Sequence, residues 1–195
     1  GLVESFNGAV ISLAAGDAHT CAVASGNVFC WGKNNEGQLG YASTNSCDST
    51  WGTPCSSHPK AVQGLGAKAT EVATGVYHSC AILAGNVVKC WGKPYGSPVA
   101  IRGLTGKLES LSSGQFHACV VDDGTVKCWG EDYRNSNQQK SDYFNATPVT
   151  GIPGKAVKVR AGYHNSCAIN ESSELWCWGW NGDGELATTG RVVSK

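Results

Sequence analysis

The sequence predicts an all-β fold, and three observations support that prediction. A unit rich in glycine and cysteine recurs four times along the 195 residues. Each unit contains short apolar runs separated by tight-turn residues, which is the pattern of antiparallel strands. No stretch shows the 3.6-residue periodicity of an amphipathic helix. The 26 glycines and 10 cysteines are also typical of a small extracellular β-domain.

The four repeated units end in Cys-Trp-Gly and occupy residues 14–32, 73–92, 112–130 and 160–179. Their first cysteines are 59, 39 and 48 residues apart, and the long first period contains an insertion around 47–59. Periods of about 40–50 residues with several short strands each predict the blades of a β-propeller. We expect one domain, residues 1–195, whose repeats are roughly 1–56, 57–94, 95–145 and 146–195.

The second unit illustrates the four antiparallel strands expected in each blade. They are predicted at about 69–73, 78–83, 87–91 and 99–103. The second and third strands form a hairpin, because a short segment of turn residues separates them in every unit. These segments are Ser25-Gly26, 84–86, Asp123-Gly124 and 171–173. Nearly continuous apolar runs indicate strands that are covered on both faces, as in a blade between two others.

Counting back from each hairpin turn places two cysteines opposite each other. With Ser25-Gly26 as a two-residue turn, Cys21 faces Cys30 in a non-hydrogen-bonded pair, where Cα atoms lie about 4.5 Å apart. A disulfide accepts that separation. The third unit counts in the same way, and in the second and fourth units a three-residue turn absorbs one extra residue between the cysteines. The two cysteines that remain lie together in the insertion. The predicted bridges are Cys21–Cys30, Cys47–Cys55, Cys80–Cys90, Cys119–Cys128 and Cys167–Cys177.

A zinc site is the alternative use of these cysteines. The sequence contains no Cys-x-x-Cys, and regular pairs on separate strands would not converge on one metal ion. Disulfides explain the pattern better, and they persist in oxidising compartments. We therefore expect an extracellular or cell-surface protein with no metal and no cofactor.

The repeated motif resembles that of a known family. Its pattern is A-G-x-x-H-[ST]-C-A-[VI], then G-x-V-x-C-W-G-x-N-x-x-G-Q-L-G, most complete from Ala15 to Gly40 and recurring at 178–186. This resembles the regulator of chromosome condensation repeat family. The resemblance implies a β-propeller, typically of seven blades, with varied binding roles. The cysteine-bearing version is similar to secreted microbial members, which include a proteinaceous β-lactamase inhibitor. The nucleotide-exchange role of the nuclear founder is not expected, since the disulfides and the zero net charge oppose it.

Three histidines, His19, His78 and His117, hold one repeat position, at which the fourth unit has Asn165. A ring of histidines around a propeller axis is one way to bind a metal. A position that accepts His or Asn is explained more simply by a structural hydrogen bond, which either side chain can make.

Motifs that carry chemistry are few in this chain. Asn181, Asp183 and Glu185 are spaced like the start of a calcium loop, but they align with the turn at 34–38 of the first unit. The sequence contains no G-x-S-x-G, P-loop or complete dinucleotide motif. We therefore expect a protein that is not an enzyme and has no catalytic residues.

Aromatic side chains fall into two groups. The tryptophans of Cys-Trp-Gly are expected in the blade cores: Trp31, Trp91, Trp129 and Trp178. Others lie in the turns after the first strand and the loops after the third, which share one face of a meander: Tyr77, Phe116, Tyr163, Trp51, Tyr95, Tyr133, Tyr143, Phe144 and Trp180. Aromatic residues anchor interfaces, so we expect this face to bind a ligand or to mediate assembly. Packing of these side chains within their own loops is the alternative.

The sequence favours a secreted, non-enzymatic binding module whose ligand is a protein or a glycan. A structural subunit of an extracellular self-assembling complex or filament is the alternative. The 15 basic and 15 acidic residues disfavour a nucleic-acid binder, which needs excess positive charge. No run of 18 apolar residues is present, so membrane insertion is not expected.

Four blades are fewer than the family's usual ring, and an open array exposes an apolar blade face at each end. The segments 2–6 and 191–193 have the composition of short strands. We expect chains to complete one another, as a closed pair of about eight blades or as a head-to-tail filament. A compact four-bladed monomer and a fragment of a longer propeller are the alternatives.

Overall fold

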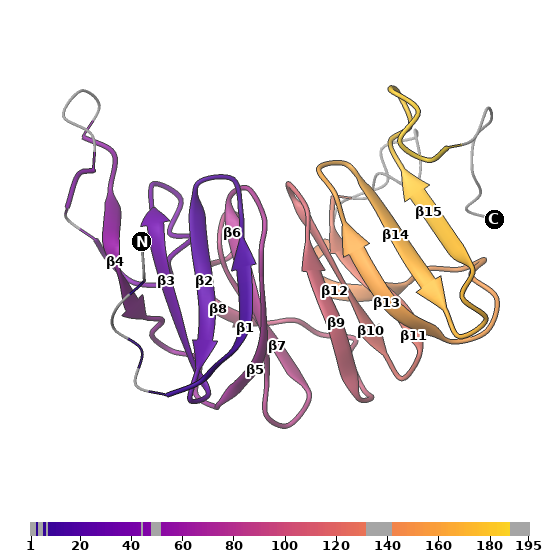
Figure 1. Ribbon diagram of the computed structural model, residues 1–195, viewed down its shortest axis with the longest axis horizontal. Coiled ribbons are helices and arrows are strands. Elements are labelled where there is room, and N and C mark those ends of the chain that lie inside the picture. Colours follow the sequence, from indigo (N-terminus) through magenta and orange to yellow (C-terminus); the bar gives the residue numbers. More distant parts are fainter. Residues whose placement is uncertain are drawn as a thin grey trace. The chain divides into compact units, whose positions relative to one another are not determined.

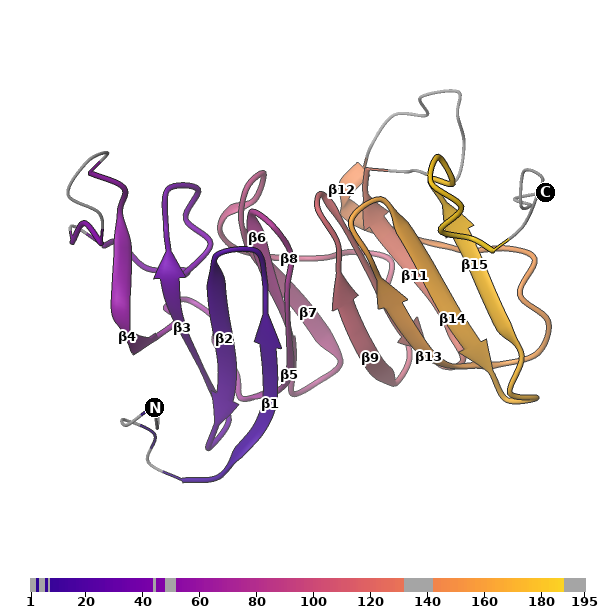
Figure 2. The same ribbon diagram turned by 45° about the horizontal axis from the view of Figure 1, so that its top comes forward.

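The computed structural model describes residues 3, 6, 8–43, 45–47, 52–131 and 142–187. These residues form two compact units, Gly1–Ala100 and Ile101–Lys195, each built from two antiparallel sheets (Figures 1 and 2). We call the four sheets blades 1 to 4 in chain order. The all-β prediction is confirmed. Among the described residues, no helix is long and apolar enough to cross a membrane.

Each blade is a meander in which strands that follow one another in the chain are neighbours in the sheet. Blade 1 contains β1 (Val10–Ala15), β2 (His19–Ala24), β3 (Asn27–Lys33) and β4 (Cys55–Ala61). Blade 2 contains β5 (Ala69–Thr74), β6 (His78–Leu83), β7 (Val87–Gly92) and β8 (Gly96–Ala100). Blade 3 contains β9 (Leu108–Ser113), β10 (His117–Asp122), β11 (Thr125–Gly130) and β12 (Asp142–Pro148). Blade 4 has three strands in its described part: β13 (Ala156–Ala161), β14 (Asn165–Asn170) and β15 (Leu175–Gly179).

The last strand of blade 2 lies earlier in the chain than the sequence predicts. It is Gly96–Ala100 rather than 99–103. The chain turns back within three residues after Gly92, so Gly96 pairs with Gly92 and Val99 pairs with Cys90. The predicted strand assumed a longer loop, because the residues of this turn do not form a two-residue hairpin signal.

The hairpin between the second and third strands has the predicted register in all four blades. In blade 1, Ala24 pairs with Asn27, and three residues further along the ladder Cys21 pairs with Cys30. The structure joins the five cysteine pairs expected from the sequence: Cys21–Cys30, Cys47–Cys55, Cys80–Cys90, Cys119–Cys128 and Cys167–Cys177. The four hairpin pairs have Cα atoms 4.0–4.1 Å apart, and the pair in the insertion has 5.8 Å.

The glycine of Cys-Trp-Gly lets the chain leave the third strand close to a carbonyl group. Gly92 has a φ of +86°, and a Cβ atom there would lie 2.5 Å from the carbonyl oxygen of Tyr77. The next residue, Lys93, donates its backbone N–H to that oxygen at 3.0 Å. The equivalent bond recurs in every other blade, as Lys33 to Ala18, Glu131 to Phe116 and Trp180 to His164. The repeat therefore needs glycine for both its backbone angle and its lack of a side chain.

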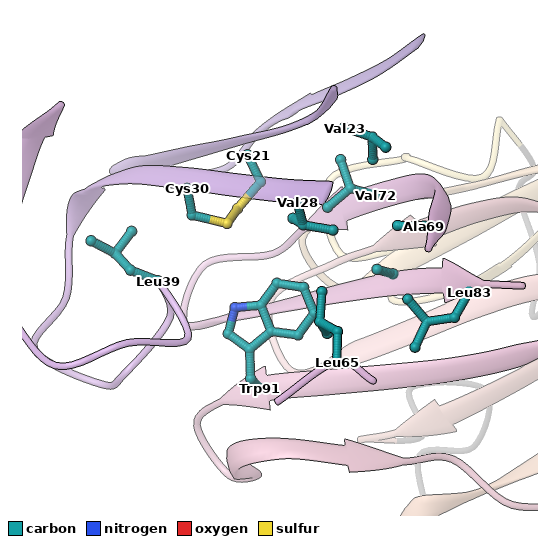
Figure 3. Close-up of a cluster of buried hydrophobic side chains, with 11 residues drawn as sticks. Cys21, Val23, Val28, Cys30, Leu39, Leu65, Ala69, Val72, Leu83 and Trp91 are labelled. Carbon is teal, nitrogen blue, oxygen red and sulfur yellow. A yellow bond between two sulfur atoms is a disulfide. The ribbon is translucent and has the colours of Figure 1, made fainter. Parts of the chain in front are cut away.

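Neighbouring blades in a unit pack through one recurring arrangement, which Figure 3 shows for blades 1 and 2. Ala69 and Val72 of β5 and Trp91 of β7 lie in one buried cluster with the Cys21–Cys30 bridge. Blades 3 and 4 repeat it with Ala156, Val159, Trp178 and the Cys119–Cys128 bridge. In each unit, the first strand of the second blade thus lies against the disulfide-bearing face of the first.

The repeated tryptophans are core residues in three blades. Trp91, Trp129 and Trp178 are buried, whereas Trp31 in blade 1 is half-buried. Trp31 lies on the face of blade 1 that turns away from blade 2, where the ring of Phe6 lies 6.1 Å from it. The expectation of a core tryptophan is therefore met only in part at Trp31, because no described blade packs on this face of blade 1.

Substitution of two glycines distinguishes the cost of a steric clash with a carbonyl group from the cost of a positive φ. Gly92→Ala should lower the free energy of unfolding by about 3 kcal/mol, because its Cβ meets a backbone carbonyl. Gly85→Ala is the matched control: its φ is +88°, but nothing lies within 4 Å of its Cβ. It should cost about 1 kcal/mol. If urea unfolding shows that both variants lose the same free energy of unfolding, the clash with the Tyr77 carbonyl is not what makes Gly92 necessary.

The bridges can be mapped chemically. Proteolysis without reduction, followed by mass spectrometry, should recover five linked peptides and no bridge between blades. Replacing Cys80 and Cys90 together by serine should lower stability by roughly 2–3 kcal/mol, because the ring of about ten residues no longer constrains the unfolded chain. A bridge that joins two blades would contradict the hairpin register.

Candidate binding face

The aromatic residues expected on a binding face differ widely in exposure. Three are exposed: Phe144, Tyr163 and Trp180. Three are half-buried: Tyr77, Phe116 and Tyr143. Tyr95 is buried, with its ring 5.8 Å from the ring of His78, so little of it is accessible to a ligand. Trp51 and Tyr133 lie outside the described residues. The two most exposed rings, Tyr163 at 57% and Trp180 at 55%, belong to the same blade.

Tyr163 and Trp180 both contact His164 in the turns of blade 4. Tyr163 lies in the turn between β13 and β14, and the ring of His164 is 4.4 Å from its own. Trp180 follows β15 and donates its backbone N–H to the carbonyl of His164 at 3.0 Å. A Cβ at Gly182 would clash with Nε1 of the indole ring, which therefore extends over that glycine. We call Tyr163, His164 and Trp180 the blade 4 patch.

A residue from blade 3 fixes the orientation of Tyr163. The side-chain amide of Gln115 donates to the Tyr163 hydroxyl at 2.6 Å, and its backbone N–H donates to the Tyr163 carbonyl at 3.1 Å. Gln115 is itself buried. An aromatic side chain that is already ordered loses less conformational entropy on binding. The sequence analysis did not identify Gln115, because no local signal shows that it contacts the next repeat.

The alignment of the turns explains why Tyr163 is exposed and its expected equivalents are not. After the turn glycine, Tyr77 and Phe116 occupy the second position, and both are half-buried. Tyr163 occupies the first position, and His164 takes the second. The sequence prediction grouped the three aromatics as equivalent, but the structure places Tyr163 one residue earlier in the turn.

The segment that is spaced like a calcium loop is a structural turn. The Oδ1 atom of Asn181 accepts the backbone N–H of Leu186 at 2.9 Å, and Glu185 accepts that of Asp183 at 3.0 Å. The first blade repeats both bonds, with Asn34 accepting from Leu39 and Gln38 accepting from Glu36. No group of three or more His, Cys, Asp or Glu side chains in the described part of the chain is arranged to hold a metal ion.

Two of the repeated histidines, His19 and His117, tie the first blade of each unit to the second. A hydrogen bond of 2.8 Å joins His19 Nε2 to the Ser79 hydroxyl, and one of 2.9 Å joins His117 Nε2 to the Ser166 hydroxyl. Burial lowers the pKa of His19 to about 4, although the Asp17 carboxylate acts in the opposite direction. His19 is therefore neutral near pH 7, as a buried structural side chain requires.

A hollow of about 400 Å³ lies beside the Cys47–Cys55 bridge and is lined by Ala18, Gly32, Lys33 and Thr53 as well. Lys33 is the one titratable side chain among these lining residues. The lining as described does not bring together the acid–base or nucleophile–base pair that most catalytic mechanisms use.

Family models and sequence relatives place the chain among known proteins. Two models of the regulator of chromosome condensation (RCC1) repeat match residues 25–82, and 10–38 with 156–185. The human E3 ubiquitin-protein ligase HERC2 is 28% identical over 87% of this chain, which covers 4% of HERC2. The ultraviolet-B receptor UVR8 of Arabidopsis thaliana is 28% identical over 94% of this chain, which covers 44% of UVR8.

Two solved structures with the same fold are about twice as long as this chain. Human WBSCR16 has a TM-score of 0.79 at 21% identity, with 96% of this chain and 52% of that chain covered. Yeast RCC1 (Prp20), crystallised with bound Kap60, has a TM-score of 0.72 at 19% identity, with 92% and 46% covered. These likenesses establish the propeller fold and leave function to be argued from the site.

The lowered pKa of His19 makes a prediction about pH. The unfolded chain, with a histidine pKa of about 6.5, takes up a proton before the folded chain does. The free energy of unfolding is therefore highest above about pH 6.5. It decreases as the pH falls towards 4, by up to roughly 3 kcal/mol. In His19→Asn, which copies the residue of blade 4, this part of the pH dependence should disappear. Urea unfolding at about pH 7 and pH 4.5 measures it. Parallel pH profiles of the two proteins would contradict the assignment.

Proposed function

Because the chain belongs to the RCC1 repeat family, we propose that it is a non-enzymatic protein-binding module whose partner contacts the blade 4 patch. The observation that carries the proposal is the pair of exposed rings of Tyr163 and Trp180. Hydrogen bonds from Gln115 orient Tyr163, and the backbone N–H of Trp180 is bonded to the carbonyl of His164. Tyrosine and tryptophan are the residues most enriched among those that dominate binding energy in protein interfaces.

The polar groups around the patch suit a protein partner. The Tyr163 hydroxyl is anchored by Gln115, and the imidazole of His164 lies beside the tyrosine ring. A patch of this kind combines apolar area with hydrogen-bonding capacity at its rim, which is the composition of a protein interface. The yeast RCC1 propeller, which shares the fold, is seen in complex with the protein Kap60.

The five disulfides support a location outside the cell or at its surface. All ten cysteines of the chain are paired. Hairpin bridges of this kind form and persist in oxidising compartments and are rare in the cytosol. We therefore infer that the partner is also an extracellular or surface-exposed protein.

The proposal is tested by capture followed by measurement on the purified partner. Wild-type protein, a Tyr163→Ala/Trp180→Ala variant and a Val87→Ala control are immobilised and exposed to extracellular proteins of the source organism. Val87 is an exposed apolar residue at a hairpin turn of blade 2, outside the patch. Proteins retained by wild type and control are then purified. The double variant should bind them at least about 30-fold more weakly, the effect of losing one strong anchor.

Equal binding of all three proteins by every purified candidate would contradict the proposal. Binding of soluble oligosaccharides, with loss in the double variant and no retained protein, would assign the patch to a glycan instead. Because both rings are exposed, the double variant should melt within a few degrees of wild type, and a large drop would place the rings in the core.

A further inference from the structure

Two apolar surfaces are exposed on the first and last blades of the chain. The first, which we call the N-terminal face, is on blade 1 and contains Val10, Leu13 and the half-buried Trp31. The second, the C-terminal face, is on blade 4 and contains Ile169, Leu175 and the half-buried Cys167–Cys177 bridge. Leu13 and Leu175 are each 67% exposed. Exposed apolar positions of this kind on a strand indicate an interaction surface.

The strand register shows what the N-terminal face corresponds to in the other blades. Leu13 pairs with the residue after the first cysteine of its hairpin, as Val72 does in blade 2 and Val159 does in blade 4. Both counterparts are almost completely buried, against the disulfide-bearing face of the preceding blade. Leu13 therefore occupies a position that elsewhere packs on another blade.

The C-terminal face is the other half of that contact. Ile169 lies two residues after the first cysteine of its hairpin, and Leu175 lies two residues before the second. Their counterparts are Val23 and Val28 in blade 1 and Val121 and Val126 in blade 3, all of them buried under the first strand of the next blade. Figure 3 shows this contact in blades 1 and 2, with Val23 and Val28 in the same cluster as Val72.

Polar groups repeat the same complementarity. Between blades 1 and 2, the carbonyl of Gln38 accepts from Trp91 Nε1 at 2.9 Å and from the Ser79 hydroxyl at 2.9 Å. Blade 4 carries the equivalent turn, in which Glu185 takes the place of Gln38. Blade 1 carries the equivalent donors, since Trp31 holds the position of Trp91 and Thr20 holds the position of Ser79.

We propose that the N-terminal face of one chain docks on the C-terminal face of a second copy. Leu13 then lies against Ile169 and Leu175, and Trp31 donates to the carbonyl of Glu185. The contact continues the blade-to-blade interface already present within each unit, and both complementary halves are on this one sequence. Two copies also supply the length of human WBSCR16 and yeast RCC1, of which this chain covers 52% and 46%.

The contact is heterologous, so each chain uses one face as donor and the other as acceptor. It involves neither ring of the blade 4 patch. Loss of self-association and loss of partner binding are therefore separate results, and failure of one proposal does not imply failure of the other.

The test is the mass of the full chain in solution, measured by sedimentation or light scattering over a range of concentrations. Wild type should have the mass of two or more chains at micromolar concentration. Leu13→Asp and Leu175→Asp should each raise the dissociation constant at least about 100-fold, because each buries an unpaired charge. Val87→Asp is the matched control and should associate like wild type.

Mixing the two variants distinguishes the proposed contact from other modes of association. A Leu175→Asp chain keeps an intact N-terminal face, and a Leu13→Asp chain keeps an intact C-terminal face. The mixture should therefore form a heterodimer that neither variant forms with itself. Leu13→Ser and Leu175→Ser, which introduce no charge, should show the same pattern if an aspartate variant fails to fold.

A wild-type chain that remains a monomer up to about 100 µM, with a melting temperature independent of concentration, would overturn the proposal. It would assign the two faces to blades of a longer chain. Association of wild type without recovery in the mixture would also overturn it, because the contact would then join two identical faces.

Discussion

Within each unit, the packing of the second blade's first strand and tryptophan on the disulfide-bearing face of the first blade is the contact on which the rest of the structure depends. In unit 1 it buries Val72 and Trp91 with Val23, Val28 and the Cys21–Cys30 bridge. A single meander of short strands has two faces and cannot cover either by itself. Stacking solves this for both sheets at once, and it explains why apolar residues occupy nearly every position of the central strands.

The polar features of the repeat serve the same contact. The carbonyl of Gln38 accepts hydrogen bonds from Trp91 and Ser79, and Ser79 is also hydrogen-bonded to His19. Buried donors and acceptors from two blades therefore satisfy one another. Such a network is costly when incomplete and stabilising when complete, since a buried polar atom without a partner loses its hydration. The family motif therefore describes an interface between repeats as much as the structure of one repeat.

Binding capacity arises where the repeat departs from its own pattern. Blade 4 has Tyr163 at a turn position that holds Gln115 in blade 3, and Trp180 follows the Trp-Gly pair where blade 1 has Lys33. Neither ring is needed for stacking, so both remain exposed on a rigid support. The N-terminal and C-terminal faces differ from the blade 4 patch, because their residues follow the pattern by which blades stack. A second copy of the chain therefore fits them.

The sequence alone determined the hairpins, their register and the cysteine pairs, because a short turn and an alternating pattern specify these contacts locally. It also determined the blade architecture, since a repeated unit needs a repeated neighbour. Only the tertiary structure decided where β8 begins, that Tyr95 is buried against His78, and that Gln115 orients Tyr163. These features depend on loop conformation and on contacts between residues that are distant in the chain. No local pattern of residue types encodes such contacts, because their energy comes from neighbours that the fold brings together.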